Sequence, residues 1–355
     1  SFFPHGCRDV SPTDLKPSTN AWAAAAAPLG PLVQLDCAGF LVNKRHHRGF
    51  GLAVLDVAYA LRAAFDGTRD VAWRPIYSIA ARWRREADPG DAVFWIDGLP
   101  KTAFEEGYGL QTPLRTGQLA VVRYHPYAER ALAVVRASLL ESEANDAEIR
   151  GRVAAATTLD AVYSFAGGRD FWVTAPCGSE RRDAPLEGTR VTLQKRPHGG
   201  FDFTIRTPGT PPRWRLYDLE LTHHWDRLLA AARRFRGGGD DDAAAREDVV
   251  AGAAKLFYYW VSFGPLSRGS AYCGYAVLAG TLVAAGLSPC SLPANRQFDW
   301  EAILSPTPAA FLEEHAAWLF DGATRASSDP LAGLPPPDDA LATSRDRAHA
   351  LLAEV

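Results

Sequence analysis

The sequence of 355 residues lacks methionine, has five cysteines, and shows little excess charge of either sign. Its formal net charge is −3 and its pI is near 6.3. General nucleic-acid binding is disfavoured, because it depends on a basic excess that releases the counterions of phosphates. The cysteines form no CxxC pair, so their spacing indicates neither a zinc ribbon nor a disulfide framework. We expect reduced thiols in a cytoplasmic or nuclear protein.

Long apolar runs and nucleotide-binding motifs are also missing. The longest apolar run, 272–287, has 16 residues, whereas a membrane span needs roughly 20. It predicts a buried helix and no membrane span. No Walker A, GxGxxG or GxSxG pattern occurs, so we expect no cofactor. His223 and His224 are adjacent and face different directions on a helix, which indicates no metal site. The start at Ser1 without methionine suggests a piece of a longer protein.

The composition is that of a globular protein, with 47% hydrophobic and 11% aromatic residues. Apolar spacings of three and four predict the helices 49–64, 75–86, 127–143, 216–236, 243–259, 270–286 and 307–320. Alternating or β-rich runs predict the strands 92–96, 118–124, 171–174, 189–195 and 201–207, the last two forming a hairpin. The expected fold class is α+β, predominantly helical, with a small antiparallel sheet.

The pattern along the chain predicts one compact α+β domain over 31–320, with a β-rich part at 165–215 and a helical core at 243–320. Residues 1–30 carry several prolines and little periodicity, so we expect an extended lead-in there. Residues 321–355 are expected to form a tail with a terminal helix.

The turn 264–270, just before the longest apolar run, is the first candidate site. Its backbone N–H groups and the Arg268 guanidinium could meet at a helix N-terminus and attract an anion, with Gly269 and Ser270 as loop donors. It also suits an ordinary helix start, because Ser267 or Ser270 could cap the helix and Arg268 could pair with a carboxylate.

A second basic segment, Asn43 to Arg48, precedes the first predicted helix and offers Lys44, Arg45 and Arg48 as anion contacts. Cations at a helix N-terminus oppose the macrodipole, so either an anion neutralises them or they point into solvent. His47 would be the general base of any reaction, because imidazole titrates near neutrality.

A third basic segment follows the predicted hairpin and contains Arg206 and Arg213. Arginine beside Trp214 suits stacking or bidentate capture of an anion. The alternative is cation–π packing within the fold.

Several segments together carry a resemblance to a known family. In chain order they are QLDCAGFLVNKRHHRG, WRPIYSIAARWR, GQLAVVRYHPYAER, LEGTRVTLQKR, FDFTIRTPGTPPRW, FYYWVSFGPLSRGSA and FDWEAILSPTPAAFL. Over residues 34 to about 320 they resemble the C-terminal region of the tetratricopeptide repeat protein 13 family and its plant relatives, the suppressors of effector-triggered immunity. In that family the region follows an array of tetratricopeptide repeats, which this sequence does not contain.

This resemblance implies a regulatory or adaptor protein of cytoplasm and nucleus that binds protein partners. In plant-type members it implies negative regulation of immune or stress signalling. It identifies no activity for this region, so an enzyme is not the favoured interpretation.

A weaker likeness points to a different class of function. The segment 264–272 is similar in spacing to the Fic motif, with Pro265 and Gly269 matching, but Gly264 stands where the catalytic histidine would be. Without an imidazole there is no base for adenylyl transfer, so a Fic-type helical core here would be degenerate.

The rival hypothesis is therefore a phosphate- or nucleotide-directed enzyme, or a Fic-like pseudoenzyme, that takes a phosphate-bearing small molecule. Its anion contacts would be Lys44, Arg45, Arg48, Arg206, Arg213, Arg268, Gly269 and Ser270, with His47 as base. Convergence of these residues in one concave pocket would favour this rival. Dispersal over separate faces, or an exposed apolar patch, would favour partner binding.

Overall fold

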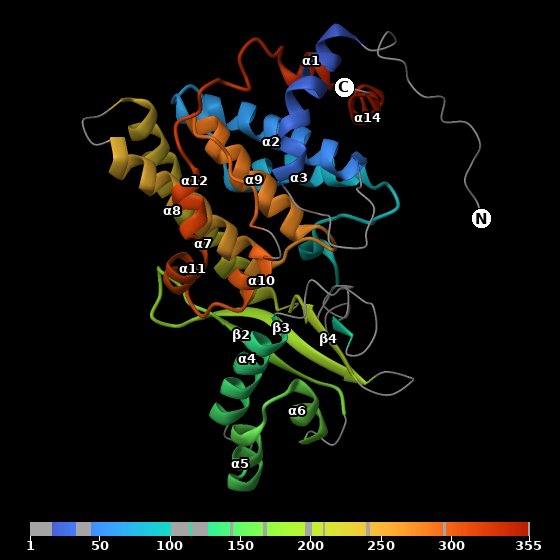
Figure 1. Ribbon diagram of the computed structural model, residues 1–355, viewed down its shortest axis with the longest axis vertical. Coiled ribbons are helices and arrows are strands. Elements are labelled where there is room, and N and C mark those ends of the chain that lie inside the picture. Colours follow the sequence, from blue (N-terminus) through green and yellow to red (C-terminus); the bar gives the residue numbers. More distant parts are fainter. Residues whose placement is uncertain are drawn as a thin grey trace, which may run out of the picture.

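The computed structural model describes residues 16–32, 44–100, 114–115, 127–142, 145–165, 169–195, 201–208, 210–238, 242–293 and 296–353. Figure 1 shows a large helical body at one end, a twisted sheet in the middle, and a small group of helices below the sheet. Within the described residues, no helix combines the length and the apolar character needed to cross a membrane.

The helical body is built from long helices that are far apart in sequence. They are α1 (Pro17–Ala26), the 3₁₀ turn η2 (Ala27–Leu32), α2 (Lys44–Phe65), α3 (Trp73–Ala87), α7 (Pro211–Arg236), α8 (Asp242–Phe263) and α9 (Ser270–Ala285). Helix α9 lies in the centre and contacts α2, α3 and α8. Its residues 272–285 are all buried, which confirms the buried helix predicted from the apolar run.

Shorter elements complete the fold. They are the 3₁₀ turn η3 (Ile96–Gly98), α4 (Tyr127–Glu141), α5 (Ala147–Ala155), α6 (Leu159–Phe165), α10 (Phe298–Ile303), α11 (Pro308–His315), α12 (Ala317–Gly322), α13 (Pro337–Ala340) and α14 (Ser344–Leu352). Helices α4, α5 and α6 form the small group below the sheet in Figure 1.

The sheet is antiparallel, with strand order β1-β4-β3-β2. Its strands are β1 (Leu114–Arg115), β2 (Phe171–Cys177), β3 (Leu186–Lys195) and β4 (Phe201–Arg206). Val191 in β3 pairs with Val173 on one side and Ile205 on the other. These apolar residues belong to a second core that includes residues of α4 and α6, as alternation of apolar side chains along a strand predicts.

The predicted fold class is confirmed: the chain is α+β, predominantly helical, with a small antiparallel sheet. Strands β3 and β4 confirm the hairpin, whose pairing runs to Lys195 opposite Phe201. The predicted strand 118–124 lies outside the described residues. The division into domains stays a prediction.

Two local predictions were wrong. Residues 17–26 of the expected extended lead-in form α1, because Pro17 suits the first turn of a helix and Trp22 is completely buried by the body. The expected strand 92–96 is only an isolated bridge of Trp95 to Leu266. Its neighbour Phe94 donates its backbone N–H to Ser267 Oγ, and its carbonyl accepts from Ser267 N–H, so this segment holds the 264–270 turn.

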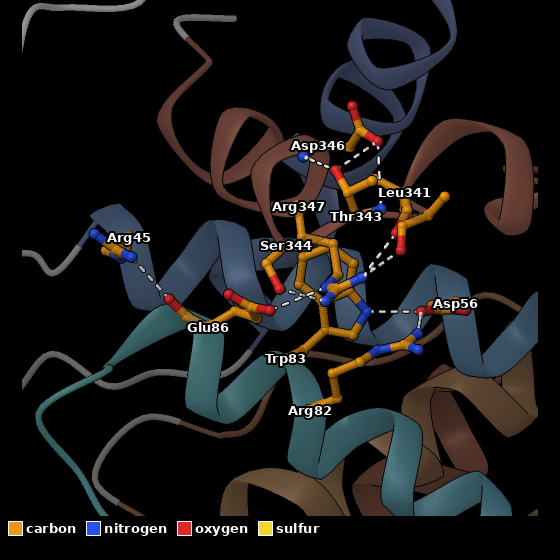
Figure 2. A network of polar contacts seen from close by, with 11 residues as sticks. Arg45, Asp56, Arg82, Trp83, Glu86, Leu341, Thr343, Ser344, Asp346 and Arg347 are labelled. Carbon is orange, nitrogen blue, oxygen red and sulfur yellow. Dashed lines mark hydrogen bonds and ion pairs between the residues drawn. The ribbon is translucent and has the colours of Figure 1, made fainter.

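The two ends of the described chain meet on the helical body. Thr343 is the N-cap of α14: its Oγ accepts from Asp346 N–H, and the Asp346 carboxylate accepts from Thr343 N–H. Asp346 also pairs with Lys16 at 2.9 Å, and its contacts with Lys16 and Thr343 lower the pKa of Asp346 to about 2. Arg347 Nε lies 3.0 Å from Glu86 Oε1 on α3, and its Nη1 donates to Leu341 O (Figure 2). The segment expected as a tail is thus tied to α1 and α3.

A glycine controls the closest approach of α2 and α9. A Cβ atom at Gly280 would lie 2.6 Å from Val57 Cγ1 and 3.0 Å from Val54 O. Both atoms belong to a closely packed helix, so neither can move away without displacing its neighbours.

We expect Gly280→Ala to lower the free energy of unfolding by about 1–3 kcal/mol, because the added methyl group overpacks the α2–α9 contact. Gly151→Ala is the matched control, since Gly151 is also helical and a Cβ there meets nothing within 4 Å. It should be neutral or stabilise by up to about 1 kcal/mol. Urea unfolding measures both, and equal effects would contradict the close-packing argument.

We expect Arg347→Ala to lower the free energy of unfolding by about 1–3 kcal/mol, because it leaves the acceptors on α3 and before α14 without their donor. Arg345→Ala, an exposed position on the same helix, should change it by less than about 0.5 kcal/mol. Thermal and chemical unfolding of the two variants compare them. Indistinguishable stabilities would show that the terminal helix does not depend on this contact.

Candidate functional site

The basic segment at the start of α2 binds the ends of two other helices. Arg45 Nη2 donates to Glu86 O at 2.8 Å in the last turn of α3 (Figure 2). Arg48 Nη1 donates to Leu351 O at 3.2 Å in the last turn of α14. Cations are favourable at helix C-termini, where carbonyl groups lack intrahelical partners. These two arginines therefore do not point into solvent, and backbone carbonyls serve as their acceptors in place of an anion. His47 is half-buried beside them, and the Lys44 side chain lies outside the described residues.

The 264–270 turn is held by its neighbours. Gly269 is the N-cap of α9 in the left-handed conformation (φ 76°), and a Cβ there would lie 2.8 Å from Arg84 Cγ. No side chain caps α9, so neither Ser267 nor Ser270 has the expected capping role. Ser267 Oγ instead accepts from Phe94 N–H, and Ser270 O accepts from Trp260 Nε1.

The remaining predicted contacts are divided between this turn and the sheet. Arg268 Nε lies 3.8 Å from Asp91 Oδ1, so it pairs with a carboxylate as the ordinary interpretation expected. Arg206 Nη2 donates to Gln194 Oε1 at 2.7 Å on the sheet.

Arg213 packs inside the protein. It is 2% exposed, donates to the carbonyls of Glu187 and Ser262, and lies over the rings of Tyr217 and Phe263. This is the cation–π packing that the sequence left open as an alternative.

The start of α2 lies close to the 264–270 turn. The ring of His46 in α2 packs edge-on against Tyr272, two residues after the turn, with centroids 6.5 Å apart. The Arg84 guanidinium of α3 lies 6.0 Å from the same Tyr272 ring. Arg206 and Arg213 lie elsewhere, at the sheet. None of the predicted anion contacts lines either of the two cavities described below. Their role in anion binding stays a prediction.

A different polar cluster, around Glu220 in α7, was missed by sequence reasoning. The Glu220 carboxylate is completely buried, and it accepts from Ser179 Oγ at 2.6 Å and from Glu180 N–H at 2.9 Å. His224, one turn along α7, places Nε2 3.4 Å from Glu220 Oε1. Burial alone would raise the pKa of Glu220, but the nearby His224 ring and the hydrogen bonds from Ser179 Oγ and Glu180 N–H outweigh it and lower that pKa.

The loop after β2 joins this cluster through Glu180. Glu180 Oε1 lies 2.7 Å from Lys255 Nζ in α8, and Oε2 lies 3.8 Å from both Arg227 and His224 in α7. The His224 ring stacks on Tyr259, with centroids 4.7 Å apart. The Glu180 carboxylate is thus held between α7 and α8, and the cations that hold it could hold another anion in its place.

The available signal was the spacing of Glu220 and His224 by four residues, which places them on one helix face. Among the described residues, no group of three or more His, Cys, Asp or Glu side chains is placed to hold a metal ion.

An apolar cavity of about 580 Å³ lies where α4, α5 and α6 meet the start of β2. Its lining is mostly apolar: Leu139, Ile149, Val153, Val162, Phe165, Phe171 and Trp172, with Asn145, Arg169 and Asp170. Trp172 is 48% exposed, and the Arg190 guanidinium lies 5.0 Å from its ring centroid.

No protein-family model matches the chain. It is 32% identical over 361 aligned positions to Suppressor of RPS4-RLD 1 of Arabidopsis thaliana, covering 82% of this chain and 34% of that protein. It is 28% identical over 327 positions to Tetratricopeptide repeat protein 13 of Homo sapiens, covering 86% of this chain and 38% of that protein. The chain is related to both proteins. The resemblance predicted from the sequence segments is confirmed, and the chain spans little more than a third of the length of each relative.

Two segments that carry the resemblance to the tetratricopeptide repeat protein 13 family meet in the structure. Tyr127 from GQLAVVRYHPYAER donates to Glu301 Oε1 from FDWEAIL at 3.2 Å, and its ring lies 6.0 Å from that of Trp300. Arg296 Nε holds the same carboxylate at 2.8 Å. These residues join α4 below the sheet to α10 in the helical body, which gives the shared segments a structural role.

We expect Glu220→Gln to lower the free energy of unfolding by about 1–3 kcal/mol at pH 7, because hydrogen bonds to a buried charged acceptor are lost. The folded pKa of Glu220 is lowered, so its contribution is present above the unfolded pKa of about 4.3 and is lost as pH falls through the folded value. The difference between wild type and variant should therefore shrink below about pH 4.

Asp226→Asn is the control for this experiment, because Asp226 is exposed on the same helix. Unfolding by urea at several pH values between 3 and 8, as a rough range set by carboxylate titration, measures all three proteins. A wild-type advantage over Glu220→Gln that persists unchanged at the acid end would contradict the proposed role of the ionised carboxylate.

Proposed function

We propose that this chain is a regulatory region that binds protein partners. A regulatory or protein-interaction role is supported by the names of the two relatives, a suppressor and a tetratricopeptide repeat protein. We further propose that it acts in the cytoplasm or nucleus, as the resemblance implies. For plant-type members the resemblance implies negative regulation of immune or stress signalling.

The observation that carries the proposal is the apolar cavity beside Trp172. Among the described lining residues, the charged ones are Arg169 and Asp170, whose charges are opposite. The lining has no net charge, so the cavity suits a neutral side chain. Trp172 is exposed on β2, which lies at one end of the strand order, and Arg190 covers one face of its ring. Tryptophan and arginine are enriched at the energetic centres of protein interfaces.

The occupant that fits is an extended segment of a partner protein. A strand at a sheet edge offers backbone groups to such a segment, and the adjacent cavity could take one of its apolar side chains. A cavity of about 580 Å³ is within the size range of binding pockets.

The placement of the basic residues also supports partner binding over the phosphate-directed rival. Arg45 and Arg48 bind helix ends, Arg213 is buried against aromatic rings, and Arg206 lies on the sheet. Anion contacts divided in this way do not share one concave pocket, which the rival requires.

We expect Trp172→Ala to weaken partner binding about thirtyfold while leaving the fold intact, because an exposed aromatic centre of an interface contributes about 2 kcal/mol or more. Thr174→Ala is the control, since Thr174 is exposed two residues along the same strand. Wild type and control are first used as bait in affinity capture, and the proteins that both retain are identified by mass spectrometry. These partners are then purified and titrated against all three proteins. Equal dissociation constants for every purified partner would contradict a binding role for this surface.

A further inference from the structure

The cavity between α7 and α8 has a volume of about 250 Å³. Small residues, including Ala231, Ala251 and Gly252, line much of it. A Cβ atom at Gly252 would lie 3.2 Å from Leu228 Cδ1, so the two helices are already in close contact at this point. The cavity is therefore small and lies between closely packed helices, so it suits a compact chemical group.

The charged residues that line this cavity are mostly cationic. Arg227 and Arg234 come from α7, Lys255 comes from α8, and Asp248 is the carboxylate among the lining residues. Asp248 Oδ2 lies 2.7 Å from Arg234 Nη2, so that carboxylate compensates one arginine at one end. Arg227 and Lys255 at the other end have no carboxylate beside them among the lining residues.

Glu180, from outside the lining, supplies that anion in this structure. Its carboxylate contacts Lys255 at 2.7 Å and Arg227 at 3.8 Å, as described above. The Glu180 backbone is fixed independently, because its N–H group donates to Glu220 Oε1 and to Tyr259 Oη. The side chain can therefore leave the two cations while the loop stays attached.

His224 adds a further polar group to the same end. It is 2% exposed, it lines the cavity, and its Nε2 makes no hydrogen bond of normal length, with 3.4 Å to Glu220 and 3.8 Å to Glu180. A buried polar atom without a hydrogen bond is costly unless a ligand supplies the partner.

We propose that this cavity binds a phosphate monoester, which replaces the Glu180 carboxylate on Arg227 and Lys255. A phosphoryl group carries about −1.5 to −2 charges at neutral pH and three strong acceptor oxygens, whereas the Glu180 side chain carries a single charge. The arginine fork binds phosphate oxygens in the way it binds a carboxylate. This site is separate from the 264–270 turn, and it does not depend on whether the Trp172 surface binds a partner.

Isothermal titration of the complete chain tests this proposal with three probes: inorganic phosphate, a short phosphoserine peptide, and the same peptide without phosphate. We expect saturable binding of the first two and none of the third. Equal affinity for the first two would show that the site reads the phosphoryl group alone, as on a small phosphate monoester, and tighter binding of the phosphopeptide would identify a phosphorylated side chain as the ligand.

Matched variants locate the binding. Arg227→Ala and Lys255→Gln should each weaken it about tenfold, because a charge-assisted hydrogen bond is lost. Arg227 is 63% exposed, so its removal leaves the fold intact. Glu180→Gln should tighten binding about three- to tenfold by removing the competing carboxylate. Arg215→Ala, exposed on the same helix, should leave it unchanged.

The proposal is overturned if folded Glu180→Gln shows no saturable binding of phosphate or phosphopeptide. It is equally overturned if Arg227→Ala binds as tightly as Arg215→Ala, because binding would then lie elsewhere. Binding of the unphosphorylated peptide with the same affinity would also overturn it, since the site would not read the phosphoryl group.

Discussion

The close contact of α9 with α2 at Gly280 is the constraint on which the helical body depends. Helix α9 is buried on all sides and has no solvent-facing surface, so each helix around it must pack closely against it. Glycine allows two such approaches, at Gly280 against Val57 and at Gly274 against Trp260. Trp260 in turn stacks on Tyr77 of α3 at 3.8 Å, so the glycine contacts and the aromatic packing position α2, α3, α8 and α9 together.

Charge in this protein is largely matched within the fold. The cations that begin α2 would oppose the dipole of their own helix, yet they reach the carbonyl ends of α3 and α14, where positive charge is favourable. Buried negative charge is matched as well, since the Asp56 carboxylate accepts from Arg82 and from Trp83 Nε1 (Figure 2). Basic clusters in the sequence therefore mark helix contacts here as well as possible ligand sites.

The two surfaces proposed for binding differ in chemistry and in place. The Trp172 cavity is apolar and lies among α4, α5, α6 and the edge of the sheet. The α7–α8 cavity is cationic and lies in the helical body, where Glu180 connects it to the loop that leaves β2. Strand β2 carries Trp172 near its start, and Glu180 lies in the loop just after its end, so one strand contributes to both surfaces.

The sequence by itself determined most of the element types, because helix and strand patterns are local. The long helices and the β3–β4 hairpin follow from the patterns of short segments, and the burial of α9 follows from its apolar run. It also carried the relationship to the two named proteins. Tertiary structure alone decided which groups meet. Arg48 and Leu351 are separated by 303 residues, and Glu180 joins Lys255 through packing of a loop on two helices. No local pattern encodes such partners, because they depend on how the helices pack, and for the same reason an apparently extended segment became α1 once Trp22 found a place in the core.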